Sequence, residues 1–178
     1  YNYYTDVAAL LGDLGELLGA THATAMAMPS KGDEDAAARF ARITRQTLRI
    51  VVEQPDFGRL MFDIGLPSER LGAELRLRLK MDIEEGVANG LFTVADVDVA
   101  ASIVAGAITG LALDLHRGVL TFDKIDPATA QLLIYLGLDA AEAERLAHAA
   151  FDFPPPPQLP MRWLALPQLP KSQTGGTP

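Results

Sequence analysis

Residues 97–115 read Val-Asp-Val-Ala-Ala-Ser-Ile-Val-Ala-Gly-Ala-Ile-Thr-Gly-Leu-Ala-Leu-Asp-Leu, and no other part of the chain constrains the architecture as strongly. The uncharged part, residues 99–113, is fifteen residues long, shorter than the roughly 20 apolar residues that span a bilayer. A helix that is apolar on every side must be covered on every side. The stretch therefore predicts a helix of a soluble domain that lies between its own core and a second subunit. Gly106 and Gly110 would let that subunit approach closely.

Proline divides the rest of the chain, because it is excluded from helix interiors but accepted at helix ends and first turns. Four of the twelve prolines punctuate residues 1–153, and the other eight lie in residues 154–178. The blocks between the first four repeat apolar residues with the period of a helix, without runs of alternating β-branched residues. We therefore expect an all-α fold followed by a Pro-rich, partly disordered tail over residues 153–178. The expected helices cover residues 6–28, 33–54, 57–64, 68–89, 96–118, 127–137 and 139–151.

Local signals predict several of the helix ends. Asp96 and Asp139 are expected N-caps, and Glu142 would complete a capping box with Asp139. Pro55 is expected to end the helix before it, and Asn-Gly at residues 89–90 to end another. One face of the helix over residues 33–54 carries Arg39, Arg42, Arg45, Arg49 and Glu53.

Composition narrows the possible functions. The chain has 178 residues, a formal net charge of −8, three histidines and no cysteine. An acidic chain is a poor ligand for polyanions by its bulk charge, and the lack of cysteine removes thiol nucleophiles, disulfides and zinc–thiolate sites. We expect no metal and no cofactor. The aromatic start without a basic region is unlike a signal peptide, so a cytoplasmic protein without a membrane segment is expected.

Three short stretches resemble the TetR family of transcriptional regulators. Tyr-Asn-Tyr-Tyr-Thr-Asp at residues 1–6 resembles the junction where an aromatic tetrad closes the recognition helix of a helix-turn-helix and the long connecting helix begins. The Lys and Glu usual in that junction are absent. Glu-Gly-Val-Ala-Asn-Gly-Leu-Phe at residues 85–92, followed by Asp96, is similar to the passage before the family's eighth helix. Leu-Leu-Ile-Tyr-Leu-Gly-Leu at residues 132–138 is similar to the end of its ninth helix.

The resemblance implies a division of the chain. The three-helix DNA-binding head would precede Tyr1, and residues 1–4 would be the end of its recognition helix. Tyr1 and Tyr3 match positions that lie against DNA phosphates in the family. Residues 5–152 would form a TetR-like C-terminal helical bundle that binds a ligand and dimerises. Residues 1–28 contain no Lys or Arg, so this chain alone should bind DNA weakly or not at all.

The resemblance also implies a mechanism. A small effector enters a pocket among the middle helices and binds one of two conformations better. The long first helix then swings and changes the separation of the two DNA-reading heads in a homodimer, so that operator DNA is released. A repressor with an apolar or aromatic effector is expected. Operator DNA would be bound only through the N-terminal head.

Candidate residues follow from the apolar faces of the expected helices. The effector-site candidates are His22, Thr44, Thr47, Leu48, Phe57, Met61, Phe62, Leu79, Ile83, Ser102 and Thr109. The dimer would form a four-helix interface from residues 96–118 and 127–138 of each subunit, with Gly106, Gly110, Leu113, Leu132, Leu133, Tyr135 and Leu136 as its candidates.

Other interpretations remain open from the sequence. Each effector-site candidate could instead be an ordinary core residue, with the hydroxyls bonded to the carbonyl four residues earlier. A stand-alone helical carrier or protein-interaction module that uses the Pro-rich tail is the alternative function. An enzyme is poorly supported, because no nucleophile elbow or phosphate loop is present.

Two charged positions have ordinary structural interpretations. His116 and Asp114 are two residues apart on a helix and do not face each other, so we expect His116 to act as a cation that stabilises the helix C-terminus and not as a partner of Asp114. Asp82 is expected on the wet side of its helix, four residues after Arg78.

Overall fold

The computed structural model describes residues 12, 13, 15, 34–63 and 68–153, with side chains from residue 75 in the last range. Within this part of the chain every regular element is a helix, which confirms the all-α prediction. Residues 12, 13 and 15 are helical, and the rest of the helix expected over residues 6–28 lies outside the described residues. The elements are α2 (Ala36–Glu53), α3 (Pro55–Phe62), α4 (Ser68–Ala88), α5 (Val97–His116), the 3-10 helix η1 (Phe122–Lys124), α6 (Ile125–Tyr135) and α7 (Ala140–Ala147).

Aspartates cap three of these helices. The carboxylates of Asp35, Asp96 and Asp139 accept backbone N–H groups two or three residues further on, at 2.8–3.0 Å, which satisfies donors that the helix itself leaves unpaired. Two details differ from the sequence prediction. Pro55 is the first residue of α3 rather than only the stop of α2. Glu142 pairs with Arg145 instead of closing a capping box.

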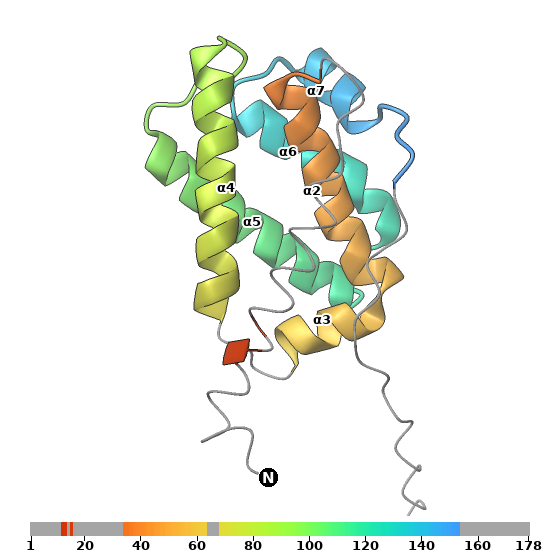
Figure 1. Ribbon diagram of the computed structural model, residues 1–178. Coiled ribbons are helices and arrows are strands. Elements are labelled where there is room, and N and C mark those ends of the chain that lie inside the picture. The colour runs from red at the N-terminus through yellow and green to blue at the C-terminus, as the bar shows by residue number, and fades with distance from the viewer. Residues whose placement is uncertain (1–11, 14, 16–33, 64–67, 154–178) are drawn as a thin grey trace, which may run out of the picture.

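α2 is the central element of the bundle (Figure 1). It packs against α3, α4, α5, α6 and α7. α4 lies across α5 on one side of the bundle. On the other side, α6 and α7 pack against α2. Several of the largest side chains of the core are at most 1% exposed. They include Phe40, Leu48, Ile83 and Leu133.

The turn between α4 and α5 depends on glycines. Gly90 adopts a φ of 70°, which glycine reaches without steric cost. The Leu91 N–H then bonds the Gly86 carbonyl at 2.8 Å, and the chain turns back so that the Phe92 ring lies directly on Gly86. Phe92 meets Phe40 edge-to-face at a centroid distance of 6.1 Å. Residues 85–92, the stretch similar to the family motif, therefore form a turn that places the Phe92 ring in the core.

Candidate functional site

Most effector-site candidates of α2, α3 and α4 face the hydrophobic core of the bundle, and we call this group the interior wall. Leu48, Phe57, Leu79 and Ile83 belong to one hydrophobic cluster and are at most 4% exposed, and Thr44 beside them is 1% exposed. Met61 and Phe62 pack against this cluster, and Thr47 is half-buried. Of these eight candidates, six lie in or against the hydrophobic core that the helices share, and the contact of any of them with an effector stays a prediction.

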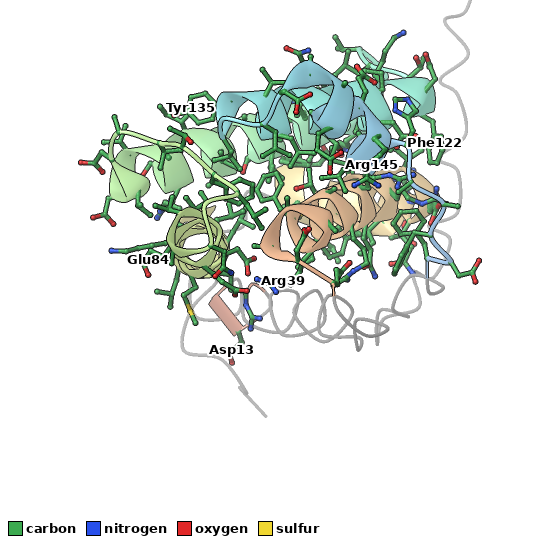
Figure 2. All side chains as sticks on the ribbon, turned by 90° about the horizontal axis from the view of Figure 1, so that it is seen from above. Asp13, Arg39, Glu84, Phe122, Tyr135 and Arg145 are labelled. Atoms are coloured by element: carbon green, nitrogen blue, oxygen red, sulfur yellow. The ribbon has the colours of Figure 1, made fainter. Side chains whose placement is uncertain are left out.

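A polar group borders the interior wall, which the sequence analysis did not single out. Arg39 of α2 lies between α2 and α4 (Figure 2), with its Nε 3.2 Å from Asp82 Oδ1 and its Nη2 2.6 Å from Glu85 Oε2. Burial raises the pKa of the Asp82 carboxyl above its ordinary value, although the charge of Arg39 acts in the opposite direction. With an exposed side-chain fraction of 22%, Asp82 is not on the wet side of α4. The sequence position could have indicated this partial burial, because Asp82 stands three residues after Leu79, at the edge of the apolar face of the helix.

Three effector-site candidates are not in this wall. His22 lies outside the described residues, as do Tyr1 and Tyr3. Ser102 and Thr109 are exposed on α5 and are not part of the buried core. The Thr109 hydroxyl donates to the Ala105 carbonyl at 2.8 Å, which is the local bond that such a hydroxyl makes when no other partner reaches it.

The outer face of α5 is apolar and uncovered. Val99 is 54% and Ile103 49% exposed, and a Cβ built on Gly106 or Gly110 would have no neighbour within 4 Å among the described residues. α5 is also the one described helix long and apolar enough to cross a membrane, and about a third of that stretch is buried. We call Val99, Ile103, Gly106 and Gly110 the outer face of α5.

Tyr135, 43% exposed, lies close to this face. The end of α6 that carries it is tied to the loop before α5, because the Thr93 N–H bonds the Leu136 carbonyl at 2.8 Å. Figure 2 shows Tyr135 on the side of the molecule where α5 begins. Leu113 is half-buried on α5. Tyr135 is therefore exposed on the side of the molecule where α5 begins.

Three of the dimer candidates are already buried within a single copy of the chain. Leu132, Leu133 and Leu136 are 8%, 0% and 0% exposed within a single copy of the chain. α6 uses its most apolar side to cover α2 and α7, so these leucines have no remaining surface to offer a partner. Tyr135 is the residue of that group on the outside.

His116 joins α3 to α5. Its Nε2 lies 3.1 Å from Asp63 Oδ2, and its ring packs on Phe62 at a centroid distance of 5.8 Å. Gly58 makes room for the ring, since a Cβ there would come within 2.4 Å of His116 Nδ1. His116 therefore holds a neighbouring helix and forms no pair with Asp114.

Comparison with known proteins agrees with this geometry. A family described as "Tetracyclin repressor-like, C-terminal domain" matches residues 35–149. The solved structure of RolR in complex with the ligand resorcinol is 27% identical, with a TM-score of 0.66 over 85% of this chain and 76% of RolR. RolR without ligand is 25% identical, with a TM-score of 0.68 over 89% of this chain and 80% of RolR. The sequence matches none of the curated proteins with which it was compared.

The helical bundle, its interior wall and the likeness to RolR define a class, the C-terminal domain of a ligand-responsive transcriptional regulator. Within that class, the chain belongs to the tetracyclin repressor-like, C-terminal domain family. The resemblance seen in the sequence is thereby confirmed.

Proposed function

We propose that this chain is the effector-sensing and dimerising part of a cytoplasmic transcriptional repressor, with residues 5–152 as its domain. It acts by binding and not by catalysis. The observation that carries the proposal is the combination of an apolar interior wall with the Arg39–Asp82 pair at its border, in a fold similar to RolR.

The effector we propose is a small aromatic compound with a hydroxyl group. An apolar lining with few polar groups is typical of sites for small organic ligands, and Phe57, Met61 and Phe62 offer aromatic and adaptable surface. A phenolic hydroxyl can donate to the Asp82 carboxylate. The RolR complex with resorcinol, a benzene ring with two hydroxyls, supports this class.

Resorcinol should bind the chain in isothermal titration calorimetry, and Asp82→Asn should weaken that binding by about tenfold. The substitution keeps the shape but removes the charge, and a hydrogen bond to a charged group contributes about 1.5–3 kcal/mol. Glu84→Gln is the matched control, because Glu84 is on the same helix with 53% of its side chain exposed. The affinity of this variant for resorcinol should equal that of the unmodified chain.

Two results would contradict the effector proposal. Absence of binding by resorcinol, phenol and catechol at millimolar concentration would exclude the aromatic class. Equal affinities of the Asp82→Asn variant and the unmodified chain, with circular dichroism showing both folded, would remove Asp82 from the contact.

The dimer we propose is formed by the outer face of α5 together with Tyr135. An uncovered apolar face of this kind is uncommon on a monomer and typical of an interface. Symmetric pairing would place Gly106 and Gly110 of both copies opposite one another, where the absence of side chains permits close helix contact. DNA would be read by a helix-turn-helix preceding Tyr1.

Effector binding would act through a shift between two arrangements of the bundle. A ligand changes such an equilibrium only by its difference in affinity for the two states. The interior wall includes α2, which touches five other helices, so a displacement of α2 reaches every part of the domain. The segment over residues 6–28 would carry the displacement to the DNA-reading heads.

A further inference from the structure

The chain after α7 returns beside α2 (Figure 1), and its aromatic rings lie against arginines of α2. Residues 149–153 read Ala-Ala-Phe-Asp-Phe, and we call them the strap. The guanidinium of Arg42 lies 5.4 Å from the ring centroid of Phe151, and those of Arg45 and Arg49 lie 5.1 and 4.5 Å from that of Phe153. We call Arg42, Arg45 and Arg49 the arginine face of α2.

The spacings of the two segments match. Arginines three or four residues apart on a helix are about 4.5–6 Å apart along its axis, and alternate residues of an extended chain are about 6.6 Å apart on the same side. Phe151 and Phe153 also meet each other edge-to-face at 5.0 Å. Arg45 fixes the register, since its Nη1 donates to the Ala149 carbonyl at 2.7 Å.

The arginine face is buried and neutralised as well as covered. Arg42 makes two bonds to Glu34 at 2.8 and 2.9 Å and is 5% exposed. Arg45 is 9% exposed and has its Nε 2.9 Å from Asp126. A cation held over an aromatic ring gains more when it is removed from water, so the ion pairs and the rings strengthen the same site.

Arg49 combines an ion pair with aromatic partners, since its Nη2 lies 2.5 Å from Glu53 Oε1. Its guanidinium lies between two rings, 4.5 Å from Phe153 and 5.0 Å from Phe122. Within the described part of the chain, no hydrogen-bond acceptor reaches its buried Nε. Glu53 and the two rings together therefore hold the Arg49 guanidinium.

We propose that the arginine face is a docking site for a segment with two aromatic residues in alternation, and that residues 149–153 of the same chain occupy it as a closing strap. The strap holds α2 from the side opposite the interior wall. A consequence that rests on the proposed function is that opening the strap loosens Thr44 and Leu48 and weakens effector binding.

The test uses the full chain and the arginine side-chain Nε–H signals in ¹⁵N-edited NMR. An aromatic ring shifts nearby protons upfield, so the Arg45 and Arg49 signals should be displaced and should exchange slowly with water. Phe153→Leu, which keeps an apolar side chain but removes the ring, should abolish the displacement and speed exchange by about tenfold, as loss of two partly desolvated cation–π contacts requires. Phe153→Trp should restore both.

Arg39 is the internal reference, because it pairs with Asp82 and Glu85, and its signal should not move. Unchanged Arg45 and Arg49 signals in Phe153→Leu would show that the strap is open in solution and overturn the proposal. If Phe153→Trp gave the same arginine signals and exchange rates as Phe153→Leu, the strap would act only as an apolar cover, and the proposal would also be overturned.

Effector affinity separates this proposal from the function proposed above. Resorcinol should bind Phe153→Leu about threefold to tenfold more weakly than Phe153→Trp. Equal affinities would refute the link between the strap and the interior wall. If resorcinol binds no variant, the proposed effector fails, while the NMR result still decides whether the strap closes on the arginine face.

Discussion

Gly110→Leu should convert the proposed dimer to monomers at micromolar concentration. A Cβ at this position meets nothing within 4 Å in the part of a single copy that the structure describes, and leucine is a better helix former than glycine, so the fold of each copy should not suffer. In a symmetric interface the substitution is present twice, and overpacking costs about 1–3 kcal/mol at each site. We therefore expect the dissociation constant of the dimer to rise by about a hundredfold or more.

Sedimentation equilibrium, compared with Ala141→Leu, checks this prediction. Ala141 is exposed on α7, away from the outer face of α5, so the control adds a side chain of the same size elsewhere. If Gly110→Leu stays dimeric at nanomolar concentration, the outer face of α5 is not the interface. If both variants dissociate, the effect is not specific to this face.

Gly86→Ala should lower the free energy of unfolding by about 2–4 kcal/mol. An added Cβ would lie 2.1 Å from Cδ2 of the Phe92 ring, and that ring is 3% exposed in the core. The ring must leave its place against Phe40, which opens space in the core. For a domain of this size we expect the melting temperature to fall by about 5–15 °C.

A double variant identifies the cause of that loss. Phe92→Leu alone should destabilise by the loss of the ring, but Gly86→Ala with Phe92→Leu should cost much less than the sum of the two, because the smaller side chain leaves room for the Cβ. Additive losses in urea denaturation would mean that Gly86 is needed for some reason other than contact with Phe92.

The helices and their ends could be predicted because their signals are local. Asp96 and Asp139 stand within three residues of the N–H groups they cap, and Gly90 stands at the turn it permits. α7 was predicted too long, since it ends at Ala147 rather than near residue 151. The residues that follow α7 instead contact α2, which lies about a hundred positions earlier in the chain.

The candidate site was harder to predict because its contacts are distant in sequence. Arg45 and Ala149 are 104 residues apart, and Arg39 and Asp82 are 43 apart. An arginine row on a helix is ordinarily interpreted as a solvated face, whereas here the returning chain, Asp126 and Phe122 lie against it. Leu133 and Leu136 show the same limit, because an apolar residue suits both its own core and a partner's surface.

The position of α2 has a consequence for how this gene can vary. Eleven of the eighteen residues of α2 are buried, against three of the eight residues of α7. In a saturation scan of all single substitutions, scored by repression in cells, α2 should therefore be the least permissive helix, on its charged positions as well as its apolar ones. Inherited change should accumulate instead on α7, and homologous regulators with different inducers should diverge there first without loss of the fold.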